Sequence, residues 1–96
     1  MLSTLSRRRR AGVRRTFTGW LISRDGYRVK LIDRTTMVYV DSLGKTILPA
    51  EMLAYPTIGA ILFVEDIPDT PERPRATVVD NVRRAYDAVG WKLLLA

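Results

Sequence analysis

The chain has 96 residues, of which 47% are hydrophobic and 27% are charged. This length fits one domain with a modest core, the composition excludes wholesale disorder, and no apolar run approaches the roughly 20 residues of a membrane-spanning helix. The absence of cysteine and histidine excludes disulfides, thiolate–imidazole zinc sites and histidine-based catalysis. We therefore expect a protein that is not an enzyme and uses no metal or cofactor.

The net charge of +6 comes from the first fifteen residues. Residues 16–96 hold ten basic and ten acidic residues and are neutral, whereas residues 1–15 hold no acid. We therefore divide the chain into a flexible basic N-terminal arm, residues 1–15, and a single α+β domain, residues 16–96. The arm contains six arginines: Arg7, Arg8, Arg9, Arg10, Arg14 and Arg15.

Three roles are open for the arm. Arginine stays charged and pairs bidentately with phosphate, so the arm can bind nucleic acid or an acidic protein surface. It can equally be a solvated tail. It is also rich in arginine and serine and starts with leucines, as mitochondrial presequences do. A secretory signal is excluded because no apolar segment follows the arginines.

Three strands are predicted at the start of the domain, over residues 16–23, 27–33 and 37–41, from alternating apolar and polar residues. The Asp25-Gly26 pair predicts a hairpin turn between the first two. Further turns are predicted after each of the other two strands.

The second strand places basic residues on its outward face. Arg24, Arg28 and Lys30, with Trp20, Tyr27 and Tyr39 nearby, would suit a surface on which nucleic-acid bases stack. The alternation of residues 27–33 also requires Tyr27 in the core, so core packing of these aromatic residues is the competing interpretation.

Residues 45–55 are predicted to form one or two helical turns, because Pro49 fits a first helical position and the residues after it favour helix. Pro56 would end this helix. Residues 58–64 form the most apolar run and predict a central strand that is buried on both faces.

Residues 65–75 are predicted to form an exposed loop, since three of the five prolines lie there. Four acidic residues in this loop match no calcium-binding loop, and we expect a solvated surface or a docking patch for a basic partner, such as the arm of a neighbouring copy. These residues are Glu65, Asp66, Asp69 and Glu72.

A helix is predicted from Thr77, with a buried stripe of Val78, Val82, Ala85, Tyr86 and Val89 and a C-terminal cap at Gly90. Thr77 and Asp80 have the spacing of a capping box, and the charged residues suggest the pairs Asp80–Arg84 and Arg83–Asp87.

Residues 91–95 end the chain with large apolar side chains. They form either a closing strand that completes the core or an anchor in a partner protein. The residues in question are Trp91, Leu93 and Leu95.

Together these elements predict an α+β fold: a small, strongly curved antiparallel sheet or partly open small β-barrel, OB- or SH3-like in outline, with one C-terminal helix. We expect a non-enzymatic nucleic-acid-associated assembly protein that uses its arm on phosphates. The alternative is a structural subunit of a virus or phage particle, in which the arm reaches a neighbouring subunit. Both functions favour a location inside a cell or a virus particle, and the presequence-like arm leaves mitochondria open.

Overall fold

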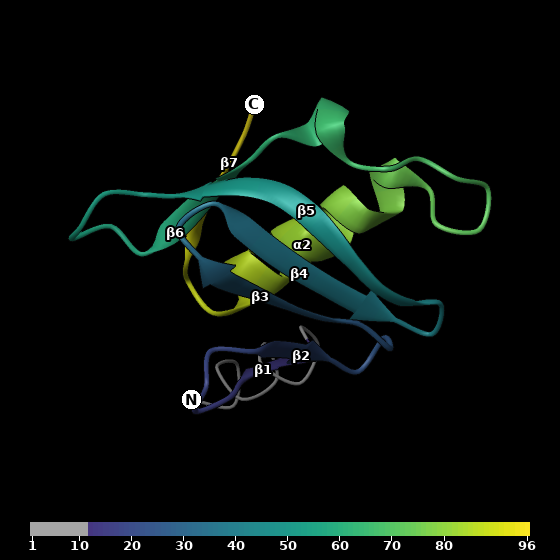
Figure 1. The fold of residues 1–96 in the computed structure, drawn as a ribbon. Helices are drawn as coiled ribbons and strands as arrows, with labels where there is room; N and C mark the ends of the chain where they lie inside the picture. The colour runs from purple at the N-terminus through teal and green to yellow at the C-terminus, as the bar shows by residue number, and fades with distance from the viewer. Residues whose placement is uncertain (1–11) are drawn as a thin grey trace.

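A computed structural model of the chain describes residues 12–96. They form a small curled sheet of seven strands, a half-barrel, with one C-terminal helix (Figure 1). The elements in chain order are β1 (Val13–Arg15), β2 (Leu21–Ser23), β3 (Arg28–Asp33), β4 (Thr36–Asp41), β5 (Gly44–Met52), β6 (Gly59–Leu62), the short 3₁₀ helix η1 (Val64–Asp66), α2 (Arg75–Ala88) and β7 (Lys92–Leu95).

The strands lie in the sheet in the same order as in the chain. Each pair from β1 to β6 is antiparallel, as predicted, but β7 runs parallel to β6. The parallel pair arises because η1 and α2 connect β6 to β7, and such a crossover returns the chain to the starting end of the sheet.

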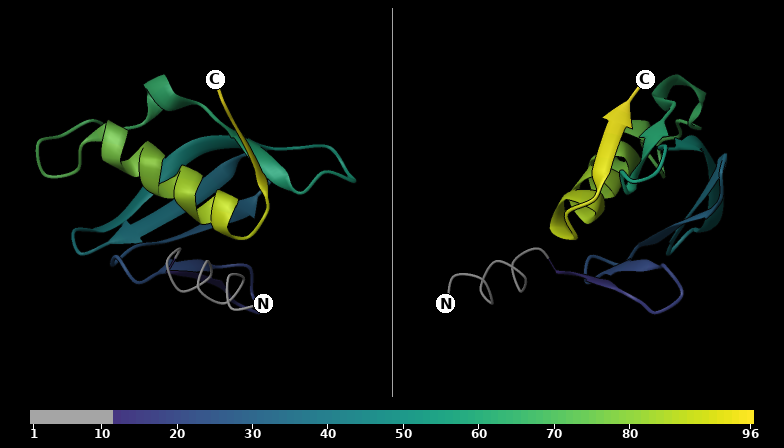
Figure 2. Two further views of the ribbon diagram at one scale, coloured as in Figure 1. Left: turned by 180° about the vertical axis from the view of Figure 1, so that it is seen from behind. Right: turned by 90° about the vertical axis from the view of Figure 1, so that its left-hand side faces the viewer.

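The sheet curls around α2, which lies against its concave side (Figure 2). The long strand β5 pairs with β4 through its first six residues and with β6 through its last three, so the sheet bends along it. The core between sheet and helix consists of side chains that are almost completely buried: Leu21, Tyr27, Val29, Met37, Tyr39, Leu48, Ala50, Ala60, Leu62, Ile67, Val78, Val82, Ala85 and Tyr86.

Several predicted elements are confirmed. The turn at Asp25-Gly26 joins β2 to β3, and Gly26 has the positive φ (+91°) that this turn needs. Four residues of the predicted stripe of α2 are buried, and the fifth, Val89, is partly buried at the C-cap; the four are Val78, Val82, Ala85 and Tyr86. Gly90 follows the helix with φ of +75°, as expected of a helix C-terminus.

The helical turn predicted for residues 45–55 is wrong, because Gly44–Met52 is strand β5. Leu48 and Ala50 are buried while Ile47 and Glu51 are exposed, which is the two-residue period of a strand. Pro49 is tolerated because it pairs with Thr36 at the end of the β4–β5 ladder, and its carbonyl accepts a hydrogen bond from the Phe63 amide.

The single strand predicted for residues 16–23 is also wrong. Only Leu21–Ser23 is extended, as β2, and it pairs with Val13–Arg15, which forms β1. A tight turn separates the two strands, in which the Thr16 amide donates to the Trp20 carbonyl (2.8 Å) and the Trp20 amide donates to the Thr16 hydroxyl (2.9 Å). The last three residues of the predicted arm therefore belong to the sheet.

The helix starts two residues earlier than predicted, at Arg75, so Thr77 and Asp80 do not form a capping box. Pro74 occupies the N-cap position with extended backbone, because proline cannot continue a helix toward its N-terminus. The predicted Asp80–Arg84 pair is present (2.9 Å), whereas Arg83 pairs with Asp80 instead of Asp87.

In the part of the chain that the structure describes, no helix is both long and apolar enough to cross a membrane.

Candidate nucleic-acid interface

Trp20 lies on the outer, convex face of the sheet, packed against basic side chains. The turn between β1 and β2 directs its ring over β3, where the Arg28 guanidinium carbon lies 4.9 Å and the Lys30 Nζ 5.9 Å from the ring centroid. Both distances are within the range of cation–π attraction. Trp20 is half-buried and is not part of the core cluster.

A row of residues crosses the outer face from β1 to β5. Arg14 pairs with Ile22, Ile22 with Arg28, Arg28 with Val40, and Val40 with Lys45. Cross-strand partners point to the same side of a sheet. Basic residues therefore alternate with apolar ones along this row.

The next row contains Lys30, Val38 and Ile47. Neither row contains an acidic residue. We call this surface the basic face and define it as Arg14, Trp20, Arg28, Lys30 and Lys45.

The spacing of the basic face suits a polyanion. Arg14, Arg28 and Lys45 are two strands apart, which is about 10 Å. That separation is close to the Debye length at 0.1 M salt, so their mutual repulsion in the free protein is weak. A chain of phosphates laid across the row would meet three cations without a carboxylate between them.

The other predicted basic residues are not part of the basic face as defined here. Arg15 points to the opposite side of β1 from Arg14, and its guanidinium carbon lies 5.8 Å from the centroid of the Trp91 ring. Arg24 is exposed in the β2–β3 turn, and its amide donates to the Gly12 carbonyl (2.7 Å). Arg7, Arg8, Arg9 and Arg10 lie outside the described residues.

Lys45 was missed in the sequence analysis. The alternation of residues 45–51 indicates a strand with Lys45 on its outer face, but the helix-favouring residues after Pro49 obscure this pattern.

Tyr27 and Tyr39 are core residues and do not join the basic face. Their rings stack at 5.7 Å between centroids, and both are almost completely buried. The Tyr27 hydroxyl donates to the Asn81 backbone carbonyl, and the Asn81 side-chain Nδ2 donates to the Tyr39 hydroxyl, each at 2.9 Å. Burial raises the pKa of both hydroxyls. These two tyrosines therefore anchor α2 to the sheet.

The four acidic residues of the predicted loop lie at the surface, and one of them also contacts the start of α2. Glu65, Asp66, Asp69 and Glu72 are all exposed, and the Asp69 carboxylate also accepts a hydrogen bond from the Arg75 backbone amide (2.9 Å) at the start of α2. Within residues 12–96, no three acidic side chains lie close enough together to hold a metal ion.

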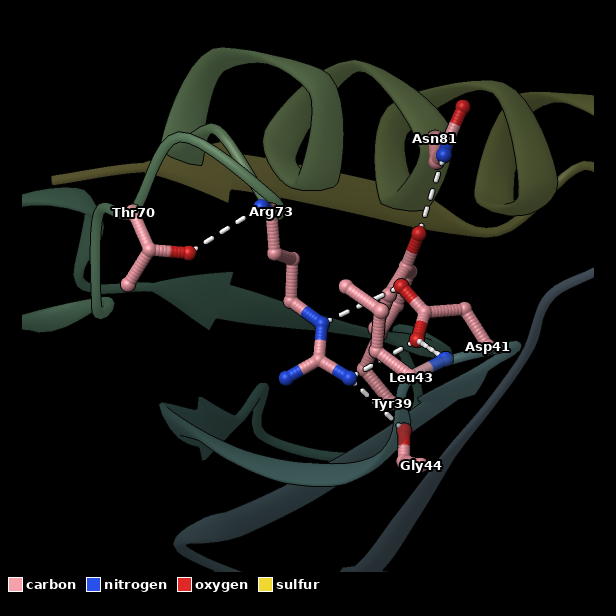
Figure 3. A network of polar contacts seen from close by, with 7 residues as sticks. All are labelled: Tyr39, Asp41, Leu43, Gly44, Thr70, Arg73 and Asn81. Atoms are coloured by element: carbon pink, nitrogen blue, oxygen red, sulfur yellow. Dashed lines mark hydrogen bonds and ion pairs between the residues drawn. The ribbon is translucent and has the colours of Figure 1, made fainter.

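An ion pair fixes this loop to the β4–β5 hairpin (Figure 3). Arg73 donates through Nη2 (2.7 Å) and Nε (3.1 Å) to the two oxygens of Asp41, and also to the Gly44 carbonyl (2.8 Å). These hydrogen bonds hold the pKa of Asp41 below its ordinary value. Asp41 lies on the inner side of β4, so it does not reduce the positive charge of the outer face.

The C-terminal apolar residues are partly buried. Trp91 and Leu93 pack against the core, and the Trp91 ring meets Tyr86 edge-on at 5.7 Å. Leu95 is half-exposed on β7, which is an edge of the sheet.

Comparison with known protein families, with curated proteins and with solved structures gives no match.

Proposed function

We propose that the protein is a non-enzymatic nucleic-acid-binding component of a larger assembly. The observation that carries the proposal is the basic face: cations from three strands lie in two neighbouring rows that contain no acidic residue, beside the half-buried Trp20. Phosphate contacts with arginine and lysine supply most of the affinity of non-specific nucleic-acid binding. Arg7, Arg8, Arg9 and Arg10 of the arm would extend this charged surface.

We also propose that the fold is a small barrel of OB- or SH3-like outline. It is supported by the meander of short, strongly curled antiparallel strands that leaves one broad outer face available. Small barrels of this kind can present a sheet face to oligonucleotides.

The test is fluorescence anisotropy of a labelled duplex across a salt series. Replacing Arg14 and Arg28 together with glutamine should flatten the slope of log affinity against log salt by about 1.8 units, given about 0.9 per phosphate on duplex DNA. The matched control replaces Arg83 and Arg84 with glutamine, because both are exposed on α2, on the other side of the sheet. No binding at low salt, or equal effects of the two double variants, would refute the proposal.

A structural subunit of a virus or phage particle is the second candidate. The observation in its favour is that β1 and β7 are the two edge strands of the sheet among residues 12–96, and that Leu94 and Leu95 are exposed along β7 (42% and 51%). Edge strands with apolar side chains pair readily with other chains. Concentration-dependent self-association that persists at high salt would support this function.

A further inference from the structure

An apolar groove of about 450 Å³ opens next to the basic face. Its size lies in the range of small-molecule sites. The β1–β2 turn, β3, the β5–β6 loop and the C-terminal end of α2 enclose it. Leu31, Met52, Ile58 and Trp91 provide much of its apolar surface.

Two aromatic side chains stand at this groove in full contact with solvent. Tyr55 lines it from the β5–β6 loop and is 95% exposed, and Phe17, which precedes the lining residue Thr18, is 104% exposed. Neither residue contributes to the core. The exposed Tyr55 ring on the wall of the groove, and the exposed Phe17 ring next to a lining residue, offer stacking surfaces to a flat ligand.

The groove shares a residue with the basic face. Lys30 is the one charged side chain among the described residues that line it, and the same lysine lies over Trp20 on the outer face. A ligand in the groove can therefore combine an apolar, flat part with a negative charge at Lys30. Such a ligand would also extend from the groove onto the basic face, for which phosphate binding is proposed above.

Tyr86 adds a polar group at the wall of the groove. It is 97% buried, yet its hydroxyl makes no hydrogen bond with any described residue, unlike those of Tyr27 and Tyr39. Burial raises the pKa of Tyr86 to about 12, so the group stays protonated and can donate. Among residues 12–96 no fully buried side-chain nitrogen or oxygen lacks a hydrogen-bond partner, so the Tyr86 hydroxyl reaches the surface of the groove. There a ligand carbonyl or ring nitrogen can accept its hydrogen bond.

We propose that the groove binds unstacked bases of a single-stranded nucleic acid while the basic face holds the adjoining phosphates. This inference rests on the proposed function and narrows it to single strands. Bases within a duplex are paired and stacked and cannot enter such a groove, whereas those of a single strand can stack on Phe17 and Tyr55.

The experiment compares a labelled oligothymidine with a duplex of equal length, using the full chain at low salt and fluorescence anisotropy. The wild type should bind the single strand at least tenfold more tightly. Tyr55→Ala and Phe17→Ala should each weaken single-strand binding about tenfold, as expected for a lost stacking contact, and leave duplex binding unchanged. Leu43→Ala is the matched control, since Leu43 is exposed (56%) on the β4–β5 turn and does not line the groove.

Tyr86→Phe tests the hydroxyl while keeping the ring and its packing on Trp91. It should weaken oligothymidine binding severalfold without lowering the melting temperature. A lower melting temperature with unchanged binding would show that the hydroxyl serves the fold instead.

The outcomes separate the two proposals. Equal affinity for single strand and duplex would overturn the proposal that the groove binds bases, and so would undiminished single-strand binding in both aromatic variants. Neither result would contradict phosphate binding by the basic face. Self-association that is lost in Tyr55→Ala, with single-strand binding intact, would assign the groove to a second copy of the chain and overturn the inference. Failure to bind either nucleic acid would overturn both proposals.

Discussion

At the scale of single residues, Asp41 and Arg73 show how a polar contact joins distant parts of this chain. The two residues are 32 positions apart, and their side chains are only 18% and 19% exposed. The pKa of Asp41 is lowered chiefly by the Arg73 hydrogen bonds, from an ordinary value of 3.8. The pair therefore stabilises the fold above about pH 4, and this stabilisation is lost as pH falls through the lower folded pKa.

Asp41→Asn is expected to lower the free energy of unfolding by about 1–2 kcal/mol at pH 7, because it removes a charge-assisted, two-point contact. Urea denaturation measures this value. The difference from the wild type should shrink as pH falls below 3.8.

The control for this prediction is Asp80→Asn, which removes an exposed carboxylate that pairs with Arg83 and Arg84 on α2. Solvent screens such surface pairs strongly, so the urea midpoint should not move. A destabilisation as large as that of Asp41→Asn would contradict the distinction between the two sites.

At the scale of elements, Gly59 decides whether β7 can join the sheet. It pairs with Lys92, and a Cβ atom at this position would lie 2.0 Å from the Lys92 carbonyl oxygen. That contact is with backbone, which cannot rotate away as a side chain could. The parallel pair of β6 and β7 therefore depends on the missing side chain.

Gly59→Ala is expected to destabilise the protein by about 1–3 kcal/mol, the usual cost of overpacking. Amide exchange should locate the effect at Lys92–Leu95. Thr57→Ala, an exposed change in the preceding loop, should leave stability and exchange unaltered. Unchanged protection of β7 in the Gly59 variant would show that the strands can separate and re-pair at no cost.

Elements are predictable from this sequence where the local pattern and the tertiary environment agree. The β2–β3 turn, β3, β4 and the buried face of α2 have clear periods and turn residues. Strand β5 was misassigned because the residues after Pro49 favour helix, and only its two neighbours, β4 and β6, hold it extended. The parallel pairing of β7 was not predictable because no local pattern encodes a partner about 30 residues away.

The candidate site was predictable in part. Arg28 and Lys30 were placed on an outward face by the alternation of one strand, and the structure adds their neighbours. Arg14 and Lys45 join them only through the register of β1 and β5. The groove contains residues from four separate segments, so its existence depends on how the sheet curls.

At the scale of the whole molecule, β1 marks where the folded domain begins among the described residues. Val13 packs against the core, the Gly12 carbonyl accepts from the Arg24 amide, and Arg15 reaches Trp91. The contact between Arg15 and Trp91 connects the first strand of the half-barrel to the segment that leads into its last.

Removing residues 1–11 is expected to leave the thermal unfolding midpoint nearly unchanged, whereas removing residues 1–15 should lower stability by about 2–4 kcal/mol. The larger deletion eliminates the β1–β2 hydrogen bonds and the apolar cover that Val13 provides. Thermal melts of the two shortened chains and the full chain measure the difference. Equal midpoints for both deletions would show that β1 contributes nothing to stability.

The parallel pairing of β6 with β7 also affects how the protein is made. At a synthesis rate of about 5–20 residues per second, the roughly 30 residues between Leu62 and Lys92 take about 1.5–6 s to emerge from the ribosome. During that interval β1 to β5 can pair in succession, but one edge of β6 lacks its partner. The nascent chain therefore carries an apolar, unpaired strand edge for seconds, the kind of surface that chaperones bind.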